Sequence, residues 1–278
     1  MTDIPDQHPG DAVAVAYLHQ DVVSSSWHHS IIELLAHDLA TSQRVFRGGW
    51  VAMHCGTGGL VEARNQAVET FLREKAADWL FWVDTDMGFP ATVVDTLMEV
   101  ADPETTPVVG ALCFSQRELE ADGMGGYRTA ATPTIMDWTH VDGQAGFAVR
   151  WNYERGKVVR CAGTGSACIL IHRSAFERVA ERFGPIWYDR VPNASTGQLI
   201  GEDLSFCMRL GALEIPVHVH AGVEASHHKG IWLTEETYVR QCMAEAMIQA
   251  QAEQEPSTNG TPVNQARENA RRRLKAVR

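Results

Sequence analysis

Short apolar runs alternate with segments of helical spacing through the first 114 residues of this chain. The runs cover residues 12–18, 50–54, 79–83 and 107–114. Apolar runs of this length, bounded by polar residues, are typical of strands buried in a parallel sheet. The pattern therefore predicts an α/β fold in which helices pack on both faces of the sheet.

The segments between these runs carry the helical signals. Residues 27–39 have apolar side chains at helical spacing and follow three serines, which are favoured N-cap residues. Residues 60–76 predict a long helix. A third helix is expected to run from about Pro90 to Val100, because proline is tolerated in the first helical turn.

The second half of the chain has a different character. Residues 115–160 are rich in glycine, threonine and aromatic residues, and their weak periodicity predicts short antiparallel strands and a mobile loop. Gly163-Thr164-Gly165 precedes a strand, so it is not a dinucleotide-binding fingerprint, which follows one. Strands are then expected at 167–171 and 215–220, and helices at 174–182 (capped by Ser174), 201–210 and 234–253.

Charge separates the body of the chain from its end. The net charge is −11, so the body is expected to repel the phosphate backbone of nucleic acids. From residue 267 onward, six cationic residues oppose one glutamate. Such a run is usually a solvated segment, although it could contact an anionic partner such as nucleic acid.

The lack of recognisable targeting signals and the spacing of the cysteines predict a cytoplasmic protein. No apolar run approaches the roughly 20 residues that a membrane-spanning helix needs. The polar, acidic start lacks the pattern of a secretory signal. The six cysteines form no CxxC pair and no compact disulfide framework, which favours buried free thiols in a reducing compartment.

Two carboxylates follow the strand predicted at residues 79–83. Asp84 and Asp86 lie one residue apart, where the strand ends. Carboxylates beside a core are costly unless a partner compensates them, and Mg²⁺ or Mn²⁺ is a natural partner. The alternative is an aspartate-rich turn that caps a helix. In an open α/β sheet the carboxyl ends of the strands are also where ligands bind.

Two later segments carry further candidates. Glu202 and Asp203 open a predicted helix, where acidic residues suit the helix dipole but could also supply a general base. His227, His228 and Lys229 follow the last predicted strand. Imidazole ligates transition metals readily, although either histidine could equally be a solvated loop residue.

Taken together, three segments resemble the GT-A glycosyltransferases. The likeness covers roughly residues 12–232 and is strongest to the family-2-like enzymes, including short bacteriophage versions. It implies a Rossmann-like mixed sheet with helices on both faces, and, if phage-encoded, a location in the host cytoplasm. The segments are Glu62-Ala63-Arg64-Asn65, Asp84-Thr85-Asp86, and Gly201-Glu202-Asp203 with His227 one strand later.

The resemblance implies how a nucleoside-diphosphate sugar is held. Asp84 would face the ribose or the metal, and Asp86 would ligate Mn²⁺ or Mg²⁺ between the two phosphates. His227 is the better match for a further metal ligand, with His228 as its rival. Arg64 would reach the nucleotide. Two weaker matches are Asp21, which would contact uracil or ribose, and Lys229, which would contact the diphosphate. The donor that the resemblance favours is a UDP-sugar.

The resemblance also implies the chemistry. In inverting members an acidic pair supplies the general base, which points to Asp203 and secondarily to Glu202, acting on a hydroxyl acceptor.

The expected organisation is a disordered lead (1–11), one domain (12–253) and a flexible basic tail (254–278). The domain divides into a nucleotide-binding half (12–114), an acceptor half (115–232) and a C-terminal helix (233–253).

Two other functions share the motif. Nucleotidyltransferases also pair carboxylates with Mg²⁺, but they usually carry a glycine-rich, basic loop after the first strand. Residues 18–23 contain no glycine, lysine or arginine. A non-catalytic sugar- or partner-binding module is the second alternative, and the oligomeric state cannot be read from the sequence.

Overall fold

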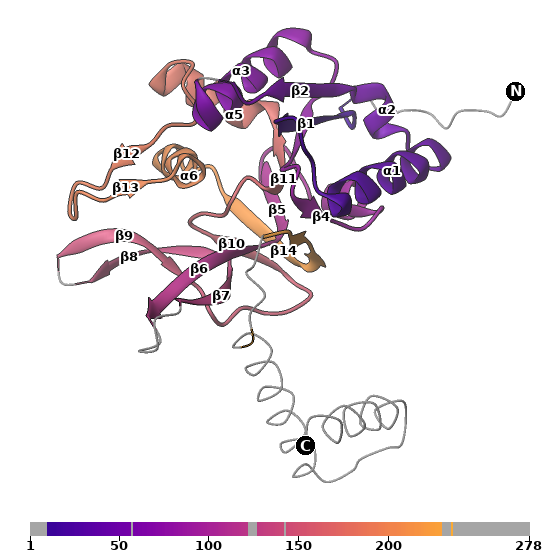
Figure 1. Ribbon diagram of the computed structural model, residues 1–278. Helices are drawn as coiled ribbons and strands as arrows, with labels where there is room; N and C mark the ends of the chain where they lie inside the picture. The colour runs from indigo at the N-terminus through magenta and orange to yellow at the C-terminus, as the bar shows by residue number, and fades with distance from the viewer. Residues whose placement is uncertain (1–9, 57, 122–126, 142, 230–234, 236–278) are drawn as a thin grey trace, which may run out of the picture. The chain divides into compact units, whose positions relative to one another are not determined.

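A seven-stranded mixed sheet forms the centre of the computed structural model (Figure 1). The structure describes residues 10–56, 58–121, 127–141, 143–229 and Glu235. The order across the sheet is β10-β14-β5-β11-β3-β1-β2. Its strands are β1 (Val13–His19), β2 (Trp50–His54), β3 (Trp79–Val83), β5 (Val108–Leu112), β10 (Val158–Cys161), β11 (Cys168–His172) and β14 (Val217–Glu224).

Three of the six neighbouring strand pairs of this sheet are parallel, as the alternating pattern predicts, and three are antiparallel. β1 is parallel to β2 and β3, and β5 is parallel to β14. β11 instead runs antiparallel to both β3 and β5, and β10 runs antiparallel to β14. The physical reason is that no crossover helix lies between β5 and β11, and a parallel return needs such a crossover. The predicted mixed α/β sheet is confirmed.

Helices cover both faces of the sheet, as predicted. Strand side chains alternate, so Val13 and Val15 of β1 pack on one face and Ala14 and Ala16 on the other. One face is covered by α1 (Ser25–Ala40), α2 (Arg44–Gly48) and α4 (Val93–Met98). The other is covered by α3 (Gly59–Glu74), α5 (Arg173–Phe183) and α6 (Glu202–Ala212). β3 is buried along its whole length, which explains its unbroken apolar sequence.

The helix starts match the sequence signals at α1 and α6 and differ at α4 and α5. Ser24 caps α1, and its hydroxyl accepts a hydrogen bond from the backbone N–H of Trp27 at 3.1 Å. The predicted cap Ser174 of α5 is wrong. The His172 ring accepts from the Ser174 N–H, so the cap lies two residues earlier. α4 begins at Val93, after the proline turn, rather than at Pro90.

Antiparallel hairpins form the region of weak periodicity, as predicted. They are β6–β7 (Phe114–Ala121 and Tyr127–Pro133) and β8–β9 (Met136–Val141 and Gln144–Val149). A third hairpin, β12–β13 (Val191–Pro192 and Leu199–Ile200), precedes α6. In Figure 1 these hairpins lie on the side of the molecule away from β1 and β2. The predicted helix at 234–253, the tail and most of the lead lie outside the described residues.

Two further predictions concern membranes and thiols. Within the described ranges, no helix is both long and apolar enough to cross a bilayer. The five described cysteines are all free. Cys113, Cys161, Cys168 and Cys207 are buried and Cys55 is half-buried, so the expected free thiols are confirmed there. Cys242 lies outside the described residues.

Candidate active site

The turn after β3 presents the two predicted carboxylates. The N–H of Asp84 donates to the carbonyl of Ala167 at 2.9 Å, and the N–H of Met87 donates back to the Asp84 carbonyl at 3.1 Å. The chain then forms β4 (Met87–Gly88), which pairs with β15 (Ser226–His227). A Cβ on Gly88 would lie 2.5 Å from the Ser226 hydroxyl, so a larger residue here would displace that side chain. The pairing carries His227 to the side of Asp86.

Asp86 is the centre of a cluster with His227 and Lys229. Its Oδ2 lies 3.1 Å from His227 Nε2 and 2.9 Å from Lys229 Nζ. Burial alone would raise the pKa of Asp86, but the hydrogen bonds from His227 and Lys229 outweigh it and lower the pKa to about 2. Asp86 is therefore a carboxylate at any ordinary pH.

The two ring nitrogens of His227 have different partners. Nδ1 lies 2.9 Å from the carbonyl oxygen of Phe114, which can only accept, so Nδ1 carries a proton. Nε2 is the nitrogen that meets the Asp86 carboxylate, at 3.1 Å. Burial lowers the pKa of His227, yet the hydrogen bonds to Asp86 and Phe114 raise it overall. These two contacts therefore favour the charged form of the His227 ring.

This arrangement fits a divalent cation. Asp86 and His227 could both serve as ligands, and metal-bound histidines typically donate their other N–H to a carbonyl or carboxylate, as Nδ1 of His227 does to Phe114. No group of three or more His, Cys, Asp or Glu side chains is placed to hold a metal in the part of the chain that the structure describes. Two protein ligands suit Mg²⁺ or Mn²⁺, which commonly fill their other positions with water and substrate phosphates.

A second, deeper cluster surrounds Arg64 of α3. Its Nη2 lies 3.1 Å from Oδ1 of Asp84 and 3.7 Å from Oδ1 of Asp203. Arg64 is 1% exposed, so its side chain is buried rather than solvated on the surface of the helix. Its guanidinium packs over the rings of Trp82 and Tyr188, with centroid distances of 5.0 and 5.5 Å. Arg64 thereby joins the end of β3 to the start of α6.

The charges of this cluster compensate one another. Burial lowers the pKa of Arg64, but Asp84 and Asp203 raise it further, so the guanidinium stays charged. Burial raises the pKa of Asp84 despite the opposing effect of Arg64. Nε and Nη1 of Arg64 and Oδ1 of Asp203 have no hydrogen-bond partner among the described residues. Unpaired buried polar atoms are costly, and the ion pairs of Arg64 with Asp84 and Asp203 offset part of that cost.

The two acidic residues at the start of α6 differ in their burial and contacts. Glu202 is nearly buried at 9% exposure, with Arg190 Nε 3.8 Å away. The Asp203 side chain is 28% exposed and lies beside the glycine turn, since Oδ2 is 3.7 Å from where a Cβ on Gly165 would stand. The helix dipole favours both acids here, yet only Asp203 reaches the Arg64 cluster.

The remaining candidates lie apart from these contacts. Asp21 is exposed and makes no hydrogen bond or ion pair with any described residue. The side chain of His228 is exposed, and its backbone N–H donates to the Asp86 carbonyl at 2.8 Å. His227, not His228, is therefore the histidine whose ring faces Asp86.

Sequence reasoning missed the aromatic support of Arg64. Tyr188 lies in the irregular segment after α5 and is held by Asn65, whose amide donates to the Tyr188 carbonyl at 2.8 Å. The Asn65 oxygen in turn accepts from the N–H groups of Trp187 and Tyr188. The position of Asn65 beside Arg64 in the chain was the only signal for this support.

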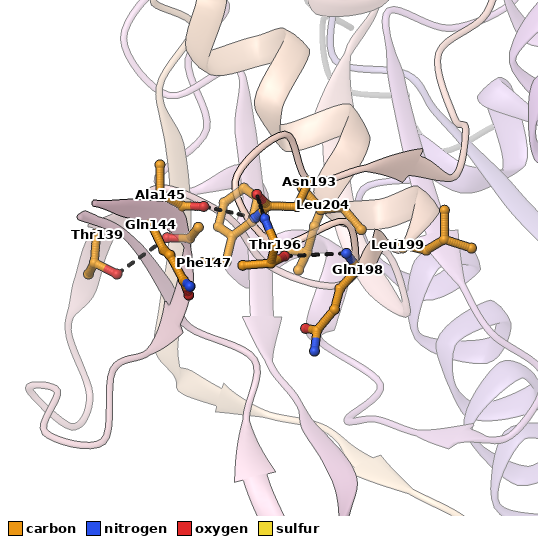
Figure 2. Close-up of a pocket in the computed structure, with 12 residues that line it drawn as sticks. Thr139, Gln144, Ala145, Phe147, Asn193, Thr196, Gln198, Leu199 and Leu204 are labelled. Carbon is orange, nitrogen blue, oxygen red and sulfur yellow. Dashed lines mark hydrogen bonds between the residues drawn. The ribbon is translucent and has the colours of Figure 1, made fainter. Parts of the chain in front are cut away.

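Two cavities lie near the clusters, and neither is lined by Asp84 or Asp86. A cavity of about 460 Å³ lies between β8–β9, β12–β13 and the start of α6, where Gly201 and Leu204 flank the acidic pair (Figure 2). A cavity of about 830 Å³ lies along the other part of α6, against β10 and Trp138. Both volumes fall within the usual range of ligand pockets.

Comparison with known proteins yields structural likeness alone. No protein-family model matches the chain, and no curated protein matches it. The crystal structure of A197 from STIV is 16% identical, with a TM-score of 0.44 over 79% of this chain and 86% of that one. GalNAc-T7, solved with UDP, GalNAc and Mn²⁺, is 13% identical, with a TM-score of 0.45 over 95% of this chain and 55% of that one.

A third solved structure is S. aureus TarS, residues 1–349, in complex with UDP-GlcNAc. It is 11% identical, with a TM-score of 0.40 over 84% of this chain and 66% of that chain. This chain thus spans only about half of GalNAc-T7 and two thirds of the solved TarS chain. Likeness at this level assigns no activity to the chain.

Proposed function

We propose that this protein is a metal-dependent glycosyltransferase of the GT-A type, similar to the family-2 enzymes. It would take a nucleoside-diphosphate sugar, with a UDP-sugar favoured, and transfer the sugar to a hydroxyl group with inversion. The observation that carries the proposal is the convergence at the end of β3. Asp86 and His227 offer two ligands to one cation, while Arg64 links Asp84 to Asp203.

Donor binding would use the outer cluster. Asp86 and His227 would hold Mn²⁺ or Mg²⁺, which when bound neutralises the charge that develops on the diphosphate leaving group. Lys229, 2.9 Å from Asp86, would add a cationic contact to the phosphates. Asp84 would contact the ribose from the same turn. Asp21, exposed beyond β1, remains a proposed contact to the base or ribose.

Transfer would use the deeper cluster. Asp203 would accept the proton of the acceptor hydroxyl as the hydroxyl oxygen bonds to the anomeric carbon of the sugar. The bond from that carbon to the diphosphate oxygen breaks at the same time, and its electron pair leaves with the nucleotide. Asp203 suits this role better than Glu202 because its side chain is more exposed and faces Arg64.

Arg64 would act through the carboxylates. A 1% exposed guanidinium has little surface for a nucleotide, whereas its contacts orient both Asp84 and Asp203. It would also supply the positive charge that lets two nearby aspartates stay ionised together. We therefore propose Arg64 as a positioning residue.

Titration calorimetry tests this function. UDP and GDP, and their sugars, would be titrated with Mn²⁺ and with a chelator, into the full chain and into His227→Ala and His228→Ala. We expect one nucleotide to bind only with metal, and the His227 variant alone to lose that binding by about 10- to 100-fold. Metal-independent binding, no binding, or equal losses in both variants would contradict the proposal.

A further inference from the structure

The cavity between the hairpins has an uncharged lining. It is an open cavity bounded by β8–β9, β12–β13 and the start of α6 (Figure 2). None of its lining residues is ionisable, although 21% of the chain is charged and the net charge is −11. A charged ligand group needs an opposite charge when it leaves water, and this lining supplies none. The lining therefore favours a neutral ligand.

Two side chains of the cavity have free hydrogen-bonding groups. Asn193 is engaged, since its amide donates to the Ala145 carbonyl at 2.8 Å and fastens one hairpin to the other. Thr196 accepts from the N–H of Gln198 at 3.3 Å. The side-chain amides of Gln144 and Gln198, in contrast, make no hydrogen bond with other described residues. An amide both donates and accepts, which matches hydroxyl groups.

The same cavity has an apolar wall. Phe147 is held by an edge-to-face contact with Trp138, at 5.0 Å and 85°. Its ring and Leu204 close on Gly163, where a Cβ would lie 2.8 and 3.0 Å from them. Sugars have this dual character, with hydroxyls at the ring edge and C–H groups on its face that pack on aromatic rings.

The cavity opens beside the base candidate. Gly201 and Leu204 line it and flank the acidic pair in sequence. Leu204 lies 3.0 Å from the Cβ position of Gly163, and Asp203 Oδ2 lies 3.7 Å from that of Gly165, so the turn at 163–165 runs past both residues. The cavity lining therefore adjoins Asp203 through its chain neighbour Leu204.

We propose that this cavity is the acceptor subsite and that the acceptor is a neutral carbohydrate. The inference rests on the proposed function and adds the class of acceptor to it. A phosphorylated, acidic or cationic acceptor would place its charge in a lining that offers no counter-charge.

Saturation-transfer NMR tests the acceptor class. The probes are methyl glycosides of glucose, galactose and mannose, compared with methyl glucuronide, glucose 6-phosphate and glucosamine. We expect a neutral glycoside to bind, and Gln144→Ala and Gln198→Ala to weaken it by about three- to tenfold each, as for a lost hydrogen bond. Asn152→Ala, which removes an exposed amide outside both cavities, is the matched control and should leave binding unchanged.

Nucleotide titration in the same variants separates the two proposals. Unchanged metal-dependent nucleotide binding, with glycoside binding weakened only in the glutamine variants, supports the acceptor subsite. If the nucleotide binds but no neutral glycoside does, or a charged probe binds as well, the acceptor proposal fails while the donor site stands. If glycosides bind but no nucleotide does, the cavity is a sugar site without the proposed transfer, and both proposals fail.

Discussion

Asp84 and Asp86 are separated by one residue on the same turn, yet their surroundings shift their pKa values in opposite directions. Burial raises the pKa of Asp84, whereas hydrogen bonds from His227 and Lys229 lower that of Asp86 to about 2. Groups separated in this way can take different roles in one site. The permanently ionised Asp86 suits a cation, and Asp84 is paired with Arg64 instead.

Replacing Asp86 should abolish metal-dependent donor binding. Asp86→Asn keeps the shape of the side chain but removes the charge shared by His227 and Lys229. We expect metal affinity to fall by at least about 10- to 100-fold, measured by Mn²⁺ titration. The control is Glu104→Gln, an exposed acid in the turn before β5. Full metal affinity in Asp86→Asn would remove Asp86 from the site.

Replacing Arg64 should destabilise the protein as well as inactivate it. Arg64→Met leaves Asp84 and Asp203 without their shared cation, and breaking a buried ion pair typically costs about 3–5 kcal/mol. Arg64→Lys keeps the charge but not the planar guanidinium that packs over Trp82 and Tyr188, so its loss of stability should be smaller. Urea unfolding of the three proteins measures the difference. Equal stability of Arg64→Met and the parent would contradict the buried cluster.

Thiol reactivity should follow burial. Burial raises the pKa of Cys161 and of Cys207 to about 12, and the thiolate is the reactive form. At pH 8 only about one in 10⁴ of these thiols is ionised, by the titration relation. Cys55, half-buried after β2, should therefore react with iodoacetamide at least about a hundredfold faster. Peptide mass mapping over time resolves the sites, and rapid labelling of Cys207 would contradict its burial.

At the scale of elements, very short pairings position long-range contacts. β4 and β15 contribute two residues each, yet their register sets Ser226 opposite Gly88 and His227 opposite Met87. That register carries His227 to Asp86 across 141 positions of chain. The β12–β13 hairpin works similarly, because Asn193 fastens it to Ala145 and so shapes the smaller cavity.

The contact between α2 and β1 depends on a glycine. A Cβ on Gly48 would lie 2.2 Å from the backbone carbonyl of Val13, which cannot move without disturbing the central strand. We expect Gly48→Ala to cost about 1–3 kcal/mol or more in the free energy of unfolding. Gly211→Ala is the matched control. Gly211 is also helical but has open space around its Cβ position, so alanine should stabilise by about 0.5–1 kcal/mol.

At the scale of the whole molecule, the proposed donor-binding and transfer clusters together draw on segments from both halves of the chain. Asp84 and Asp86 follow β3, whereas Asp203 and His227 come from α6 and β15. A ligand held by all of them binds only the folded chain, which links donor binding to global stability.

Nucleotide and metal together should therefore raise the melting temperature. At a concentration of 100 times Kd, a ligand adds about 2.7 kcal/mol, or about 5–10 °C for a protein of this size. Differential scanning fluorimetry with UDP, Mn²⁺, both, and both with His227→Ala measures the effect. We expect the full shift only with both ligands in the parent protein. A shift with UDP alone would show that the donor site needs no cation.

The sequence by itself determined the type of most long elements, the cap of α1 and the place of the acidic turn. Those features are local, because an apolar run must be buried and a serine before a helix satisfies its free N–H groups. Only the tertiary structure decided that β11 runs antiparallel, that Arg64 lies buried between Asp84 and Asp203, and that His227 faces Asp86 rather than His228. These outcomes depend on strand order, direction and register, which join residues far apart in the chain and leave no mark on local periodicity.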